Sequence, residues 1–256
     1  MSPSFDMTGR TALITGASSG LGRRFARIFA AEGARVVLAA RRIDRLRALA
    51  EEIKAAGGQA IALAMDVTDE ASVVAVYDTA EAAFGVVDTV IANAGMNSRG
   101  LATEVSAEEF DTVMAVNVRG PFLTAREGAR RMIAAGSRDN GRGRVVLVAS
   151  IGGVKVLPGL SAYCTSKAAV VMMGKSLARE WANRGVNVNV VCPGYIETEL
   201  NAEWFAEEGG LKQIAGFPRR RLMIEADLDP TLLYLASDAS RAVTGSVFTI
   251  DDGQTL

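Results

Sequence analysis

The sequence predicts an α/β fold: one domain, residues 1–256, built on a doubly wound parallel sheet of about seven strands flanked by helices. Two observations carry this prediction. Short apolar runs rich in Val, Ile and Ala alternate strictly with longer amphipathic stretches. The composition is that of a globular chain, with 49% hydrophobic and 22% charged residues, 26 Gly and 6 Pro. A chain of this length can bury one large core, so a single domain suffices.

Seven apolar runs predict strands that are buried on both faces, as in a parallel sheet. In chain order they are residues 11–14, 36–39, 60–64, 86–92, 145–149, 186–191 and 247–250. The stretches between them have the length and pattern of covering helices. These are residues 22–32, 45–55, 72–84, 108–134, 162–182 and 229–235. Right-handed crossovers through such helices produce the doubly wound arrangement.

Two segments depart from this alternation. Residues 136–143 contain Gly, Ser, Arg, Asp and Asn, which predicts an exposed loop. Residues 194–226 exceed an ordinary connection and contain Trp204, Phe205 and Phe217 among charged residues. Long connections in compact domains are often binding loops, so we interpret this one as a substrate-binding loop or lid. The alternative is a helical excursion that only packs on the core or on another subunit.

Composition also limits the classes of function. The net charge of -1 gives no bulk attraction to nucleic acid or to an anionic membrane, so a small-molecule partner is expected. There are two cysteines, no CxxC and no histidine, so neither a metal site nor a disulfide framework is expected. Any general acid or base must therefore be Tyr, Lys, Asp, Glu or Cys. The first ten residues lack a signal-peptide pattern, and no apolar run reaches about 18 residues. We expect a cytoplasmic protein.

A glycine-rich loop with the spacing Gly-x3-Gly-x-Gly follows the first strand and opens a helix. Glycines there allow a tight turn and a close approach of the backbone to a pyrophosphate, which the free amides of the helix N-terminus would bind. An ordinary turn between strand and helix is the alternative, and the position after the first strand argues against it. The residues expected to hold a dinucleotide are Gly16, Ser18, Ser19, Gly20, Leu21 and Gly22.

Three further residues suggest proton transfer. Tyr163 and Lys167 are four positions apart, so they share one face of a helix. A nearby ammonium would favour the phenolate and lower the phenol pKa from its usual value near 10. Ser150 ends the fifth strand, where an open α/β sheet forms its ligand crevice, and its hydroxyl could hold a substrate oxygen. Together these groups would polarise a carbonyl.

As a set, these motifs resemble the short-chain dehydrogenase/reductase family, which has a Rossmann fold. The resemblance spans essentially the whole chain in order. Besides the glycine-rich loop, Ser150 and the Tyr-x3-Lys pair, it rests on Asn93-Ala94-Gly95 after the fourth strand, Asn117 within a helix, and Pro193-Gly194 with Thr198 just beyond.

The resemblance implies a role for each of four residues. Tyr163 is the acid/base, Ser150 stabilises the substrate oxygen, and Lys167 is a cation near Tyr163 and the nicotinamide ribose. Asn117 holds a water that links Lys167 to solvent. Taken singly, Tyr163 could be an interface aromatic, Lys167 a solvated charge and Asn117 a helix-bending residue.

The same resemblance assigns the rest of the cofactor site. The residues concerned are Asp66, Val67, Asn93, Ala94, Gly95, Tyr163, Lys167, Pro193, Gly194, Ile196 and Thr198. The Asp66 carboxylate would accept from the adenine amine, or alternatively cap the helix that begins near Asp69.

The end of the second strand predicts which nicotinamide cofactor binds. Ala40 occupies the position where an acidic residue would accept the ribose hydroxyls, and Arg41 and Arg42 follow it. Arginine forms paired bonds to phosphate, so we expect NADP(H) to be preferred over NAD(H), with Arg41 as the main contact and Arg42 as the secondary one. The alternative is that both arginines simply begin a solvated helix.

The expected function is hydride transfer between NADP(H) and a carbonyl or secondary alcohol, of ketone or 3-oxoacyl type. An NAD-dependent alcohol dehydrogenase of the same family and a non-catalytic nucleotide-binding regulator are the alternatives. The resemblance also implies a homotetramer or homodimer built from the helices at 108–134 and 162–182. Residues 219–221 are three arginines that could attract an anionic substrate group or form a solvated cluster.

Overall fold

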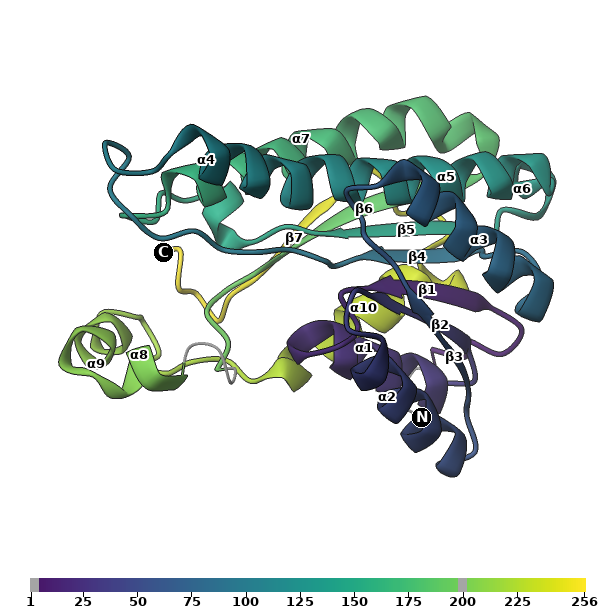
Figure 1. The fold of residues 1–256 in the computed structure, drawn as a ribbon, viewed down its shortest axis with the longest axis horizontal. Helices are drawn as coiled ribbons and strands as arrows, with labels where there is room; N and C mark the ends of the chain where they lie inside the picture. The colour runs from purple at the N-terminus through teal and green to yellow at the C-terminus, as the bar shows by residue number, and fades with distance from the viewer. Residues whose placement is uncertain (1–4, 198–201) are drawn as a thin grey trace.

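The computed structural model describes residues 5–197 and 202–256, in which seven parallel strands form one sheet of order β3-β2-β1-β4-β5-β6-β7 (Figure 1). The strands are β1 (Thr11–Thr15), β2 (Arg35–Ala40), β3 (Gln59–Ala64), β4 (Thr89–Ala92), β5 (Gly143–Val148), β6 (Val186–Pro193) and β7 (Val247–Ile250). Strand order reverses between β1 and β4, which creates the crevice where open sheets of this kind bind ligands. The predicted doubly wound parallel sheet is confirmed.

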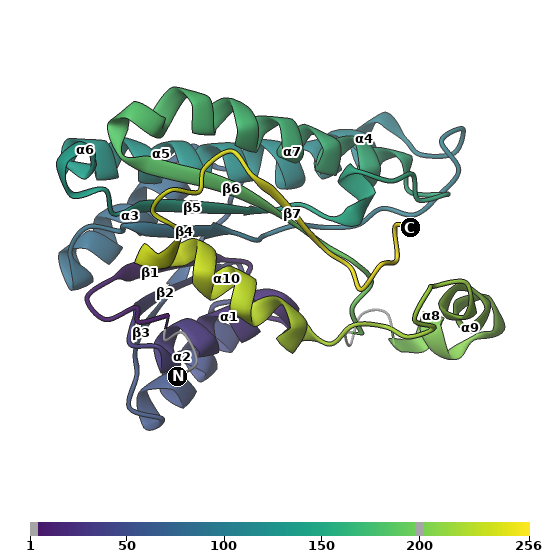
Figure 2. The same ribbon diagram turned by 180° about the vertical axis from the view of Figure 1, so that it is seen from behind.

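Helices cover both faces of the sheet (Figures 1 and 2). On one face lie α1 (Gly20–Ala31), α2 (Ile43–Ala55) and α10 (Asp229–Ala236), and on the other α3 (Glu70–Phe84), α4 (Ala107–Met114), α5 (Gly120–Ala134) and α7 (Ser161–Trp181). Three short helices complete the described chain: α6 (Ser137–Asn140), α8 (Ala202–Ala206) and α9 (Glu208–Ala215). No helix of the described residues is long and apolar enough to cross a membrane.

Alternation along the strands divides the core into two clusters. In β1, Ile14 packs with α1 and α10 residues such as Phe25 and Leu232, whereas Leu13 packs with α3 and α5 residues such as Val76 and Ala125. Successive side chains of a strand point to opposite faces, so a strand covered on both sides must be apolar throughout. This explains the continuous apolar runs in the sequence.

Three predicted elements differ in the structure. The strand expected at 86–92 begins only at Thr89, and Val86 is 40% exposed. The helix expected at 108–134 is interrupted by a π-helical turn, Ala115–Arg119, that separates α4 from α5. The loop expected at 136–143 contains α6, with Ser137 buried and its hydroxyl donating to the Arg184 carbonyl. Gly136 and Gly141 adopt positive φ and bracket this single turn, so it fits within a loop-like composition.

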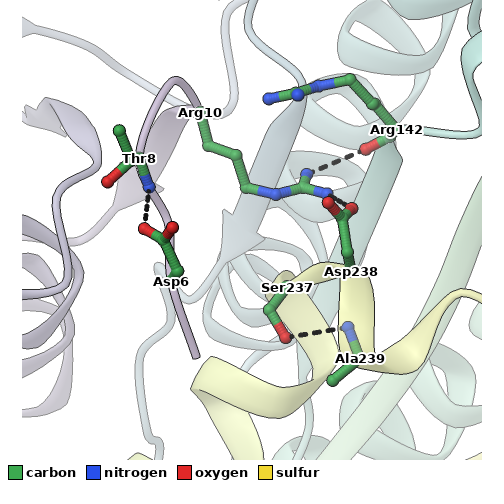
Figure 3. A pocket seen from close by; sticks show the side chains of 7 residues that line it. All are labelled: Asp6, Thr8, Arg10, Arg142, Ser237, Asp238 and Ala239. Carbon is green, nitrogen blue, oxygen red and sulfur yellow. Dashed lines mark hydrogen bonds and ion pairs between the residues drawn. The ribbon is translucent and has the colours of Figure 1, made fainter. Parts of the chain in front are cut away.

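A polar cavity of about 220 Å³ lies at the amino end of the sheet (Figure 3). Arg10 precedes β1 and is buried; its guanidinium donates to the Asp238 carboxylate and to the Arg142 carbonyl. Asp88, before β4, forms ion pairs with Arg10 and Arg142. This cluster ties the starts of the central strands to the segment that follows α10.

Candidate active site

The glycine-rich loop between β1 and α1 is packed against the end of β4. Gly16 has φ +70°, and a Cβ there would lie 3.0 Å from Ala94 Cα. A Cβ at Gly22 would lie 2.7 Å from Asn93 Nδ2. Close packing therefore favours glycine at both positions, and the positive φ favours it at Gly16 as well.

Thr15 and Asn93 join the ends of the two strands at the crevice. The Thr15 hydroxyl accepts hydrogen bonds from the backbone amides of Asn93 and Ala94, both at 3.0 Å. The Asn93 side chain donates to the Thr15 carbonyl, also at 3.0 Å. Asn93 thus joins the ends of β1 and β4. Sequence reasoning did not single out Thr15, although its place at the end of β1 was a signal.

The local geometry fits a pyrophosphate at the start of α1. Gly20 has φ +49°, and no described atom lies within 4 Å of where its Cβ would be, so the loop faces open space there. Among the described residues, the N-cap Ser19 forms no side-chain hydrogen bond to the first amides of the helix. Amides at a helix N-terminus that lack a side-chain cap are suited to an anion.

The two arginines after β2 lie in different places. Arg42 donates to Ser18 Oγ at 3.0 Å and to Ser19 Oγ at 2.8 Å, so it lies on the glycine-rich loop. Arg41 lies near Asp66, where its charge contributes to lowering the pKa of that carboxyl. Both arginines are exposed, and Ala40 ends the strand.

Asp66 forms a local turn and does not cap α3. Its Oδ1 accepts from the backbone amide of Thr68 at 2.9 Å and from the Thr68 hydroxyl at 2.8 Å, and the backbone bond is the largest cause of its lowered pKa. The N-cap of α3 is Asp69, whose side chain accepts from the Ala71 amide. The capping alternative for Asp66 is therefore wrong. Val67 is buried against Gly120 at the start of α5.

Tyr163 and Lys167 lie in the first two turns of α7, beside the end of β5. The Lys167 ammonium is buried, donates to the Val148 carbonyl at 3.0 Å and lies 5.7 Å from the centre of the Tyr163 ring. Burial lowers the pKa of Lys167 to about 8. A Cβ at Gly95 would be 3.5 Å from Lys167 Nζ, so Gly95 keeps the space beside the ammonium open.

The expected lowering of the Tyr163 pKa does not occur in this structure. Burial raises the pKa of the phenol and outweighs the Ser150 hydroxyl, which lowers it. The Lys167 ammonium lies over the Tyr163 ring and is bound to the Val148 carbonyl. In this position it does not offset the rise in the phenol pKa that burial causes. Ser150 itself accepts from the Gly152 amide at 3.0 Å.

Asn117 is buried in the π-helical turn between α4 and α5. Its Oδ1 accepts from the Met96 amide at 2.8 Å, and its Nδ2 donates to the Met96 carbonyl at 2.9 Å and to Ser166 Oγ at 3.0 Å. Ser166 in turn donates to the Tyr163 carbonyl at 2.7 Å. Asn117 therefore connects the segment after β4 to the helix that carries Tyr163 and Lys167. The sequence did not indicate Ser166, because a serine inside a helix has no distinctive spacing.

The end of β6 meets the C-terminal turn. A Cβ at Gly194 would lie 2.5 Å from Gln254 Oε1, which explains the glycine after Pro193. Ile196 is buried and forms a bridge with Met223. Thr198 lies outside the described residues. Sequence analysis did not identify Gln254, since its partner is distant along the chain.

The segment at 194–226 carries α8 and α9, which Figures 1 and 2 show set apart from the other helices, beyond the end of β6. The Tyr195 ring contacts Phe205 of α8 edge-on and stacks on Phe217, both at 5.7 Å between centroids. Arg99, in the loop after β4, lies 4.6 Å above the Trp204 ring. Aromatic contacts therefore hold this segment together, and the Arg99–Trp204 contact connects it to the loop after β4.

Two of the three arginines at 219–221 are paired. Arg219 and Arg221 contact the two carboxylate oxygens of Asp252 at 3.1 Å and 2.7 Å. The hydrogen bond from Arg221 is the largest cause of the lowered Asp252 pKa. Arg219 and Arg221 therefore connect the end of the α8–α9 segment to the turn after β7, and both remain exposed, as the solvated-cluster alternative expects.

The model of the short chain dehydrogenase family matches residues 10–209. The chain belongs to this family and is therefore an oxidoreductase of alcohol or carbonyl substrates that uses NAD or NADP.

Its relatives include D-threitol dehydrogenase of Mycolicibacterium smegmatis, 35% identical over 254 residues, which cover 98% of this chain and 95% of that one. A short-chain type dehydrogenase/reductase from Mycobacterium marinum superposes with a TM-score of 0.90 at 39% identity, covering 98% of each chain. A gluconate 5-dehydrogenase from Burkholderia cenocepacia J2315, solved with NADP and tartrate, gives 0.92 at 32% identity, covering 98% of this chain and 97% of that one.

Proposed function

We propose that this protein transfers a hydride between NADP(H) and a carbonyl or secondary alcohol, with Ser150, Tyr163 and Lys167 as its catalytic residues. The observation that carries the proposal is the position of Tyr163 and Lys167 beside the end of β5, where Lys167 is bound to the Val148 carbonyl. Ser150 follows the same strand, and its hydroxyl influences the phenol of Tyr163. The glycine-rich loop opens at the same edge of the sheet.

When bound, the nicotinamide supplies or accepts the hydride. The Ser150 hydroxyl donates a hydrogen bond to the substrate oxygen and so favours the charge that develops there. In the reducing direction Tyr163 gives its phenolic proton to that oxygen; in the oxidising direction it takes the alcohol proton. The buried ammonium of Lys167 stabilises the phenolate that proton donation leaves. Asn117 holds the Lys167 helix through Ser166. We keep it as the residue that would hold a water between the Lys167 ammonium and solvent.

The preference for NADP(H) rests on the end of β2. Two exposed arginines follow Ala40, and one of them, Arg42, already lies on the glycine-rich loop. A gluconate 5-dehydrogenase of similar structure was solved with NADP, which agrees with this preference. Binding of the two cofactors to Arg41→Asp and Arg42→Asp variants tests it. An unchanged ratio of NADPH to NADH affinity in both variants would contradict it.

We keep a ketone or 3-oxoacyl compound as the substrate class and the α8–α9 segment as the lid that binds it. Polyols and sugar acids are a second candidate class, because relatives of this chain are D-threitol and gluconate dehydrogenases. A homotetramer or homodimer, joined through α4, α5 and α7, and a cytoplasmic location complete the proposal. Exposed Phe110, Phe122 and Met172 on these helices favour such an interface. Sedimentation as a monomer would contradict it.

The deciding experiment is oxidation of NADPH and NADH by the purified protein with ketones, 3-oxoacyl thioesters, keto-sugars and keto-acids. The Tyr163→Phe variant serves as the control. Turnover with NADPH that this variant abolishes would support the function, the cofactor and the acid. Faster turnover with NADH would favour the NAD-dependent alternative. Binding of NADPH without turnover of any substrate would favour a nucleotide-binding regulator.

A further inference from the structure

The Gln254 side chain is a buried polar group close to the C-terminus. Both of its hydrogen bonds are to the backbone of Tyr195, which follows β6. Its Oε1 accepts from the Tyr195 amide at 2.6 Å, and its Nε2 donates to the Tyr195 carbonyl at 3.2 Å. The backbone carbonyl of Gln254 accepts from Lys155 Nζ at 3.0 Å. Lys155 lies five residues beyond Ser150, so one residue connects the segment after β5 with the segment after β6.

Tyr195 connects Gln254 to the α8–α9 segment. Its backbone is held by Gln254, and its ring packs edge-on against Phe205 of α8 and stacks on Phe217 beyond α9. The ring therefore contacts both ends of the pair of short helices. Tyr195 also lies near the acid/base: burial is the main cause of the raised Tyr163 pKa, and the Tyr195 phenol adds to it.

The same turn holds the other end of the segment. Asp252 pairs with Arg219 and Arg221, which precede the bridge between Met223 and Ile196. Asp251 fixes the turn itself by accepting from the Gly253 and Thr255 amides. Both ends of the α8–α9 segment are therefore attached to residues 251–255.

We propose that Gln254 is a positioning residue for the substrate site: its carboxamide holds Tyr195, and through the Tyr195 ring it holds α8 and α9 beyond the carboxyl end of β6. The close fit of Gly194 agrees with this role, because any side chain there would displace the carboxamide. The effect on substrate binding rests on the proposed function of the segment as a lid. The position of α8 does not depend on that function.

The test replaces Gln254 with Met, which has a similar length and cannot make either hydrogen bond. The chain has two tryptophans, so Trp204 of α8 becomes the only one in a Trp181→Phe background. We expect Gln254→Met to increase acrylamide quenching of Trp204 in the free protein. We also expect it to raise KM for the carbonyl substrate about tenfold, the effect of losing two net hydrogen bonds, with little change in kcat or in NADPH affinity.

Two further variants complete the test. Leu256→Ala alters a side chain in the same tail that is 95% exposed, and it should change neither measurement. Tyr195→Leu removes the connecting ring and leaves the backbone free to bind Gln254, so it should reproduce the quenching of Trp204 even if Gln254→Met does not fold.

The outcomes separate the positioning role from the proposed function. Unchanged Trp204 quenching in both Gln254→Met and Tyr195→Leu would overturn the positioning role, and so would an equal effect of Leu256→Ala. A fall in kcat and NADPH affinity as large as the rise in KM would mean a general structural role and would also overturn it. Increased quenching in a protein that turns over no carbonyl would support the positioning of α8 and refute the enzyme function.

Discussion

Two buried polar clusters lie at opposite ends of the same sheet and differ in how their charges are compensated. At the amino end, Arg10 reaches Asp88 and Asp238, and Arg144 reaches Asp238 as well as three backbone carbonyls. At the carboxyl end, Lys167 is bound to the Val148 carbonyl and, among the described residues, has no carboxylate within ion-pair distance.

The pKa values follow the same division. At the amino end, burial raises the pKa of Asp238, but Arg10 outweighs burial and the net shift is downward. At the carboxyl end, burial lowers the pKa of Lys167 to about 8, into the range where a proton can be exchanged near neutral pH. Burial also lowers the pKa of Arg144, to about 10, and this guanidinium stays charged near neutral pH. Burial of charge alone therefore does not mark the functional end of the sheet; incomplete compensation near neutrality does.

The comparison predicts the largest effect for the acid/base itself. Tyr163→Phe keeps the ring and removes only the phenolic hydroxyl, so kcat should fall about a thousandfold, within the usual range for losing a general acid. NADPH affinity should be unchanged, measured by quenching of protein fluorescence. Tyr234→Phe, on α10, is the matched control, because its ring packs on Phe5 away from the crevice. Retention of more than about a tenth of the activity by Tyr163→Phe would contradict the assignment.

Lys167→Met should remove activity and yet stabilise the fold. The folded pKa of about 8 lies below the ordinary lysine value of 10.5, so the charged lysine destabilises the native state fully below pH 8. The shift corresponds to about 3 kcal/mol, which the variant should regain at pH 7 in denaturant unfolding. As pH rises from 8 toward 10.5 the wild-type protein should recover this stability, and the two curves should converge.

Lys175→Met provides the control for that measurement, since Lys175 is exposed on the same helix. A Lys167→Met variant less stable than wild type at pH 7 would show that the ammonium is compensated after all. The distinction between the two ends of the sheet would then fail.

Asp238→Asn should destabilise the fold, whereas Lys167→Met should stabilise it. Asp238→Asn leaves Arg10 and Arg144 buried with less compensation. The free energy of unfolding should fall by about 1.5 kcal/mol, the lower end for a hydrogen bond to a charged group, because the Asp238 side chain is 75% exposed and solvent screens its charge. Since the Asp238 pKa is lowered from 3.8, its contribution is present above that pH and is lost as pH falls through the folded pKa. Asp44→Asn, with a side chain 93% exposed, is the control. A lower kcat in folded Asp238→Asn would contradict a purely structural role.

The smallest effect concerns the cofactor loop. Arg42→Ala should weaken NADPH binding about tenfold, as expected for one charge-assisted contact, and leave NADH binding unchanged. Calorimetric titration with each cofactor measures this. Arg45→Ala, at an exposed position in α2 three residues after Arg42, should change neither affinity. Equal losses for both cofactors would mean that Arg42 only supports Ser18 and Ser19.

Much of the fold could be predicted because the signals are local. A parallel strand covered on both faces must be apolar throughout, and a covering helix must be amphipathic, so each element shows its own period. The boundaries that failed, at Thr89 and at the π-helical turn around Asn117, depend on backbone hydrogen bonds that leave no period in the sequence.

The candidate site shows the same limit. By itself the sequence determined which motif follows which strand, the shared helix face of Tyr163 and Lys167, and the position of the two arginines after β2. Only the tertiary structure decided that Gln254 would meet Tyr195, 59 positions away, and that Arg10 would meet Asp238, 228 positions away. It also decided that burial would raise the Tyr163 pKa and lower that of Lys167. Periodicity is set by neighbours along the chain, whereas desolvation and long-range partners are set by what packs around a side chain once the sheet has formed.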